Sequence, residues 1–136
     1  MPDPIDPVMP QLSPRPIAAA DLERRRAENA ELIELARPHL EWLSAAHRDV
    51  AHMVALVDRD GVVLYWLARQ LDASRTPRVP GMGAPVRLAS GETVGAIKLH
   101  VATDGESASR LLVIAHTAFA IAQELKLRAQ AQARAA

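Results

Sequence analysis

Two aspartates in one turn are the first residues of this chain that could perform chemistry. Asp58 and Asp60 are separated by Arg59 and followed by Gly61, so their two carboxylates could bind a single cation. A calcium loop, however, needs more oxygen ligands in ordered succession than these two. We therefore favour the alternative, in which Asp and Gly supply the geometry of a tight turn.

The chain also contains five histidines, at His39, His47, His52, His100 and His116. A zinc-binding helix of the H-E-x-x-H kind carries its two histidines four residues apart, with a glutamate beside the first. No pair in this sequence has that arrangement. A metal site could still be assembled across elements from His52, His100 and His116. We favour the alternative that the histidines are satisfied within the fold or exposed, and we predict no metal and no cofactor.

Candidate nucleophiles and phosphate-binding loops have little support in the sequence. The chain has no cysteine, which excludes thiolate catalysis, disulfides and cysteine-ligated metal centres. Ser107 and Ser109 lack the G-x-S-x-G elbow of serine hydrolases, so we assign them to helix capping. Gly81 and Gly83 flank Met82 in a segment that could hold a phosphate, but no helix start and lysine follow them. We predict no catalytic residues and no enzymatic activity.

The charge balance argues against a nucleic-acid partner. Sixteen basic and sixteen acidic residues cancel, whereas contacts with phosphates require a surplus of positive charge. The basic run Arg24–Arg26 is surrounded by glutamates, which favours salt bridges between residues four apart on a helix. No apolar run approaches the roughly 20 residues of a membrane helix, and the first residues lack the basic and apolar regions of a signal peptide. We expect a cytoplasmic protein without nucleic-acid or membrane partners.

The prolines divide the chain into an arm and a domain. Six of them lie within the first 16 residues, and each removes an amide donor and disfavours helix in the residue before it. Residues 1–17 are therefore predicted to be a disordered, proline-rich arm. Residues 18–136 are predicted to form a single domain, because 49% apolar residues suffice for one core.

The segment 18–47 has the pattern of a helix. Its first half is polar, so we expect that half to be exposed and the second half to be packed. The apolar positions of the second half recur every three or four residues, at Leu32, Ala36, Leu40 and Leu43. Pro38 lies inside this pattern and removes one backbone hydrogen bond, which predicts a kink or a break near Arg37.

Two hairpins follow this helix. Segments 52–58 and 62–67 flank the aspartate turn, and both are apolar nearly throughout, which predicts burial on both of their faces. Segments 84–89 and 93–101 flank a second turn at Ser90–Glu92. We expect all of these strands to belong to one antiparallel sheet.

The last helix is predicted to run from about residue 104 to beyond Arg128. Thr103 and Glu106 have the spacing of a capping box, which satisfies the first free amides of a helix. A seam of apolar residues then alternates by four and three, as in a coiled coil. Its members are Leu111, Ala115, Ala118, Ala122 and Leu125. We predict that this seam is the interface of a homodimer, since Leu125 lies beyond the reach of a sheet about 20 Å deep.

Three stretches carry a resemblance to a known family: RAENAELIELARPHLEWL at 26–43, ALVDRDGVVL at 55–64 and APVRLASGETVGAI at 84–97. They resemble the leading helix and the two hairpins of the GAF-type sensory domain at the amino terminus of acetoin-catabolism activators, a group of enhancer-binding transcription activators. The resemblance covers roughly residues 24–128. Together with the order of the elements, it implies an α+β fold. That fold is a GAF/PAS-like antiparallel sheet of four or five strands, flanked by an N-terminal and a C-terminal helix.

The sequence also departs from that family. Family members carry a long central section between the hairpins, which walls the ligand pocket, whereas only residues 69–83 fill this interval here. The Walker A loop of an ATPase domain is absent from the chain. We therefore expect a shortened GAF-like domain that acts as a non-enzymatic regulatory or signalling module in transcriptional regulation. Its mechanism would be helix-mediated homodimerisation, with a regulatory protein as a further partner.

The alternative function is a small-molecule sensor with an apolar pocket. Its pocket would be lined by Leu56, Leu64, Ile97 and Leu99. The two functions differ in the volume of that pocket, because a sheet face filled by side chains cannot admit a ligand. The sequence identifies neither the ligand, nor the partner, nor the regulated process.

Overall fold

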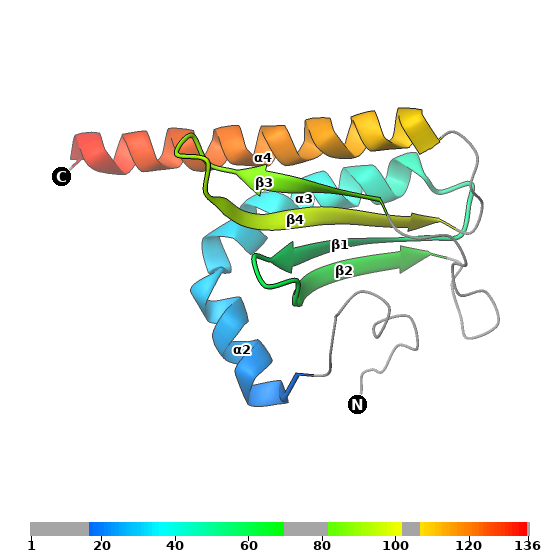
Figure 1. Ribbon diagram of the computed structural model, residues 1–136, viewed down its shortest axis with the longest axis horizontal. Helices are drawn as coiled ribbons and strands as arrows, with labels where there is room; N and C mark the ends of the chain where they lie inside the picture. Colours follow the sequence, from blue (N-terminus) through cyan, green and yellow to red (C-terminus); the bar gives the residue numbers. More distant parts are fainter. Residues whose placement is uncertain (1–16, 70–81, 102–106, 136) are drawn as a thin grey trace.

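The structure is a computed structural model that describes residues 17–69, 82–101 and 107–135. Its elements are α2 (Ala19–Glu28), α3 (Ala30–Ala46), β1 (His52–Asp58), β2 (Val63–Arg69), β3 (Met82–Arg87), β4 (Thr93–Val101) and α4 (Ser107–Ala135). Figure 1 shows these elements as one antiparallel sheet flanked by the N-terminal helices and the long helix α4. The predicted α+β class is confirmed. The predictions for the arm at 1–16, for the interval 70–81 and for the capping box fall outside the described residues.

The described strands form a four-stranded sheet in the order β2-β1-β4-β3, with every pair antiparallel. The two predicted hairpins are therefore confirmed, and they join through β1 and β4, where Leu56 pairs with Ile97. As the prediction required, β1 is buried along its whole length. The edge strand β2 is only partly buried from Tyr65 onward, so the prediction of burial on both faces holds for β1 alone. An edge strand has a neighbour on one side only, which leaves its other side open.

Both hairpins close with the same kind of turn. The amide of Gly61 donates to the carbonyl of Asp58 at 3.0 Å, and the amide of Gly91 donates to the carbonyl of Leu88 at 2.9 Å. The two glycines have φ angles of 85° and 92°, a left-handed conformation that side chains with a Cβ disfavour. A four-residue turn that ends on such a glycine sets the strand register, which explains why the sequence predicted both hairpins.

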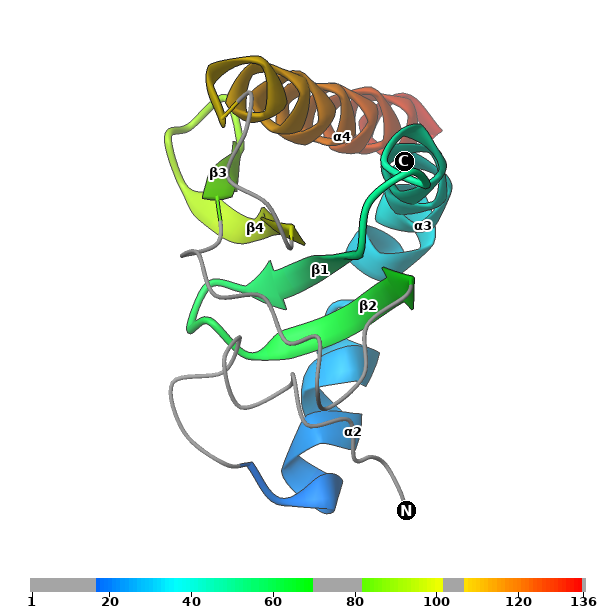
Figure 2. The same cartoon turned by 90° about the vertical axis from the view of Figure 1, so that its right-hand side faces the viewer.

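The helices α3 and α4 lie side by side on one face of the sheet (Figure 2). They run antiparallel, because the C-terminal part of α4 is paired with the N-terminal part of α3 through Arg128 and Glu34, at 2.8 Å. The main core lies between this helical layer and the sheet, and each of its larger members contributes about 1.5–3 kcal/mol by burial. Fully buried members include Leu40, Leu43, Leu56, Ile97, Leu99, Ile114 and Ile121. Most contacts of α4 with the sheet are made to β3, whereas α3 packs on β1 and β2.

The break in the N-terminal helical segment lies at Asn29 and not near Arg37. The helix α3 continues through Pro38, which is exposed, so the carbonyl that loses its helical partner can bond to water. At Asn29 the side-chain amide donates to the carbonyl of Arg25 at 2.7 Å, a local bond that competes with helix continuation. The helix α2 before the break buries none of its residues, which confirms the predicted exposure of the first half.

Candidate functional site

The four residues predicted to line an apolar pocket lie in the main core. Leu56, Leu64, Ile97 and Leu99 are each 0–1% exposed and pack beneath α3 and α4. This face of the sheet is occupied by side chains of the two helices at all four positions. The structure therefore brings the predicted pocket residues together, as part of the packed core.

The predicted dimer seam is largely used inside the chain. Ala118 and Ala122 are buried, and Leu125 packs against the main core. The argument that Leu125 lies out of reach of the sheet does not hold, because α4 crosses over β3 and carries this residue onto the core. Only Leu111 and Ala115 of the seam are exposed.

A different set of apolar side chains on α4 faces solvent. Leu112, Phe119 and Leu127 are 72%, 62% and 62% exposed, and their spacings of seven and eight residues place them on one side of the helix. His116 and Gln123 lie between them and are exposed too. We call these five residues the outer stripe. Sequence reasoning missed it because α4 is apolar on several sides, and the alternation by four and three was more regular along the buried side.

Trp42 extends this exposed surface onto α3. Its side chain is 61% exposed, so it lies outside the core. Trp42 borders a surface cavity of about 420 Å³ where the end of α3 meets the start of α4. The cavity is lined by Trp42, Ala46, His47, Asp49, Val50, Ser109, Arg110 and Val113.

Behind this cavity lies a buried hydrogen-bonded pair. The hydroxyl of Ser44 donates to Nε2 of His52 at 2.7 Å, and Nδ1 of His52 donates to the carbonyl of Val50 at 2.9 Å. This pattern assigns the proton to Nδ1 of a neutral imidazole. Burial lowers the pKa of His52, which stabilises that neutral form.

The same arrangement is also that of a serine activated by a histidine. Ser44 is only 7% exposed and His52 is fully buried, and neither lines the cavity beside them. A substrate could not reach the hydroxyl, so the pair acts as a tie between α3 and β1. Sequence reasoning missed Ser44 because eight positions and a helix end separate it from its partner.

The metal hypothesis built on His52, His100 and His116 is wrong. His52 bonds to α3 on the helical face of the sheet, whereas His100 pairs with Met53, which belongs to the cluster on the opposite face. His116 is exposed on α4. Within 17–69, 82–101 and 107–135, no group of three histidine or acidic side chains could hold a metal ion.

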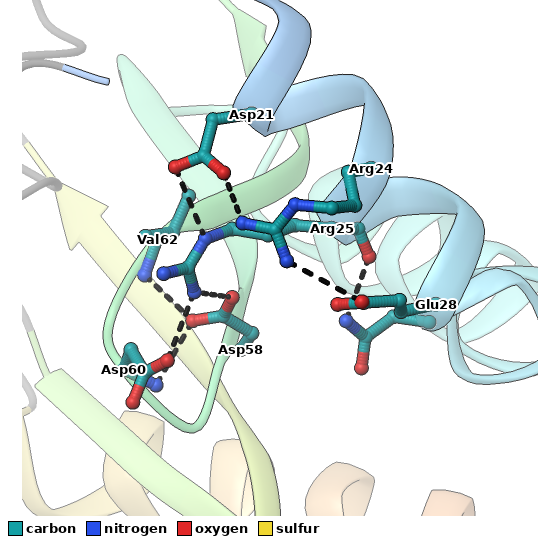
Figure 3. Close-up of polar contacts among 8 residues, drawn as sticks. Asp21, Arg24, Arg25, Glu28, Asp58, Asp60 and Val62 are labelled. Carbon is teal, nitrogen blue, oxygen red and sulfur yellow. Dashed lines mark hydrogen bonds and ion pairs between the residues drawn. The ribbon is translucent and has the colours of Figure 1, made fainter. Parts of the chain in front are cut away.

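The aspartate turn is engaged by α2, as Figure 3 shows. Nη1 of Arg25 donates to Oδ2 of Asp58 at 2.8 Å and to Oδ2 of Asp60 at 2.9 Å. The other carboxylate oxygen of Asp58 accepts the backbone amides of Asp60 and Val62, each at 2.9 Å. These contacts support the interpretation that the aspartates build the turn, and the two carboxylates raise the pKa of Arg25.

The basic run of α2 divides between local and long-range contacts. Arg24 pairs with Asp21 and Glu28 within the helix, and the pair with Glu28 has the predicted spacing of four residues. Nε of Arg26 donates to the carbonyl of Leu64 at 2.9 Å. Arg26 therefore links α2 to β2, whereas Arg25 links α2 to the aspartate turn. Nε of Arg25 is 3.9 Å from Asp21, too far for a hydrogen bond. The long-range contacts had no signal in the sequence, because only the fold sets their distance.

None of the helices within the described part of the chain is long and apolar enough to cross a membrane. The chain matches no protein-family model, no curated protein and no solved structure. The α+β fold, with a four-stranded antiparallel sheet flanked by helices, is therefore the part of the predicted relationship that stands.

Proposed function

We propose that this chain is a non-enzymatic regulatory module that acts through helix-mediated homodimerisation, with the outer stripe of α4 as the contact surface. The observation that carries the proposal is the exposure of Leu112, Phe119 and Leu127 on one side of a single helix. Large apolar side chains scattered singly over a surface are common, but an aligned group is typical of a contact site.

The outer stripe is complementary to a second copy of itself. Leu112 and Leu127 are equidistant from the midpoint between Phe119 and Ala120, and so are His116 and Gln123. In an antiparallel pair of α4 helices related by a two-fold axis at that midpoint, Leu112 of each copy faces Leu127 of the other. His116 then faces Gln123, and two polar side chains meet.

The free energy available from this contact is sufficient for a dimer of modest affinity. Each leucine or phenylalanine side chain that becomes buried contributes about 1.5–3 kcal/mol. Three such side chains from each copy are therefore comparable with the about 4–15 kcal/mol that association costs. A micromolar Kd requires a net of about 8 kcal/mol, which is reached when the gain lies in the upper part of its range and the cost in the lower part.

The resemblance of residues 26–43, 55–64 and 84–97 to GAF-type sensory domains of transcription activators supports a regulatory role. In this proposal the module works in the cytoplasm, and the dimer presents its surface to a regulatory protein. The absence of cysteine from the sequence fits a reducing compartment. The signal would pass along α4, whose C-terminal end extends past the sheet (Figure 1).

Light scattering after size-exclusion chromatography tests the proposal. The unmodified protein is expected to be a dimer at high micromolar concentration, and Phe119→Glu is expected to be a monomer, because it places a charge at the centre of the contact. Gln132→Glu is the matched control, since Gln132 is exposed on the same helix about 140° or more from the apolar members of the outer stripe. Phe119→Glu should keep its circular dichroism spectrum and melting temperature. A monomeric unmodified protein, or a dimeric Phe119→Glu variant, would overturn the proposal.

A further inference from the structure

The cavity beside Trp42 lies at one end of the helical layer, and the free end of α4 lies at the other. The cavity is formed where the last turn of α3 and the first turns of α4 meet, and its volume of about 420 Å³ is sufficient for several side chains. Trp42 stands at its edge and is 61% exposed. A large aromatic side chain beside an open hollow is typical of an interface anchor.

The C-terminal end of α4 buries none of its described residues, although Arg128 forms ion pairs with Glu31 and Glu34 of α3. Residues 126–135 are all exposed, and Figure 1 shows that the C-terminal end of α4 extends past both α3 and the sheet. At 1.5 Å per residue, the ten residues span about 15 Å. Leu127 is the large apolar side chain of this segment and is 62% exposed.

We propose that the cavity beside Trp42 receives the C-terminal end of α4 from a second copy of the chain, with Leu127 as the side chain that covers Trp42. This inference rests on the proposed function, since it uses the same two-fold axis. In that arrangement the residues of α4 that line the cavity, Ser109, Arg110 and Val113, lie opposite residues 126–130 of the partner copy. The exposed segment of one copy thereby reaches the hollow left open in the other.

The lining of the cavity fits an apolar side chain. Trp42, Ala46, Val50 and Val113 provide an apolar wall. The lining also holds one carboxylate, at Asp49, and one guanidinium, at Arg110, so its formal charges balance. We therefore expect the affinity to come from burial of an uncharged leucine and not from attraction between net charges.

Fluorescence of Trp42 in the Trp66→Phe background tests the inference, because Trp42 is then the single tryptophan of the chain. The emission of Trp42 is expected to be blue-shifted and shielded from acrylamide in the dimer, and red-shifted when Phe119→Glu makes the protein monomeric. Leu127→Asp is expected to raise the dimer Kd about tenfold or more, as each 1.4 kcal/mol lost is a factor of ten. At concentrations where the Leu127→Asp protein is still dimeric, its Trp42 emission should match that of the monomer. Gln132→Asp should leave the emission unchanged.

The outcomes separate this inference from the proposed function. If the unmodified protein is a monomer, both are overturned. If it is a dimer but Trp42 emits alike in the dimer and in the Phe119→Glu monomer, the cavity is open or filled without a second copy, and only the inference is overturned. The same holds if Leu127→Asp leaves the emission of the dimer unchanged.

Discussion

His52 and His100 are buried, at 0% and 7% exposure, and burial lowers the pKa of both below the ordinary value of 6.5. The nearby His47 lowers the pKa of His52 further, and Lys98 does the same for His100. Below pH 6.5 the unfolded chain therefore binds more protons than the folded chain. The free energy of unfolding is largest above that pH and decreases as the pH falls through it. We expect a lower melting temperature at about pH 5 than at about pH 8.

Thermal unfolding followed by circular dichroism across this pH range measures the effect. The matched control is the double variant His52→Asn and His100→Asn, in which neither side chain titrates. Its melting temperature should depend less on pH than that of the unmodified protein. Equal pH dependence in the two proteins would contradict the assignment to these histidines.

Asp58 is the carboxylate on which the first turn depends. It is 5% exposed, and it accepts the amides of Asp60 and Val62 and the guanidinium of Arg25. Asp58→Ala leaves these donors without their acceptor, so we expect a loss of about 1–3 kcal/mol in the free energy of unfolding. Urea titration measures it.

Asp58→Asn separates the two roles of that side chain. Its amide oxygen can still accept the backbone amides of the turn, whereas the charge opposite Arg25 is lost. We expect a smaller loss of stability than in Asp58→Ala. A loss as large as that of the alanine variant would show that the charge, and not the turn, carries the stability.

At the scale of the elements, β1 and β4 approach each other closely at Gly95. A Cβ atom at this position would lie 2.6 Å from the carbonyl oxygen of Val57 and 3.2 Å from the side chain of Leu32. Gly95→Ala is therefore expected to lower the free energy of unfolding by about 1–3 kcal/mol, because the backbone of β1 must shift. Gly83→Ala in β3 is the control, since the nearest atom to a Cβ at this position would belong to the flexible side chain of Lys98, at 3.3 Å. Equal losses in the two variants would contradict this explanation.

The elements whose signals are local were predictable from the sequence. Each hairpin depends on a few neighbouring residues, and the glycines at 61 and 91 have the positive φ that such turns require. The helix break was misplaced, because Pro38 disrupts a helix less on an exposed side, while Asn29 ends one by a bond to Arg25. Propensity indicates where a helix can break, but the surroundings decide where it does.

The candidate site was harder to predict because it depends on which side of α4 the sheet covers. The seam at Leu111–Leu125 and the outer stripe both carry apolar side chains at helical spacings, and periodicity alone cannot rank them. Packing on β3 buries Ala118 and Ala122 and leaves Phe119 exposed. The contact of Arg25 with Asp58 was likewise invisible, since 33 positions separate the two residues.

At the scale of the whole molecule, hydrogen bonds between β1 and β4 hold the two hairpins together in one sheet. Pairs such as Val54 with Leu99 and Leu56 with Ile97 set this junction. The four-residue turns, in contrast, fix the register inside each hairpin. The free energy of unfolding should therefore change little with the length of the interval between the hairpins. It should change strongly with the length of either four-residue turn.

Loop-closure entropy gives the size of that difference. Doubling the length of a flexible connection costs only about 0.6 kcal/mol, whereas one extra residue in a tight turn shifts a strand and turns its side chains to the wrong face. The interval between the hairpins is thus the place where a chain of this topology can gain or lose residues and keep its sheet.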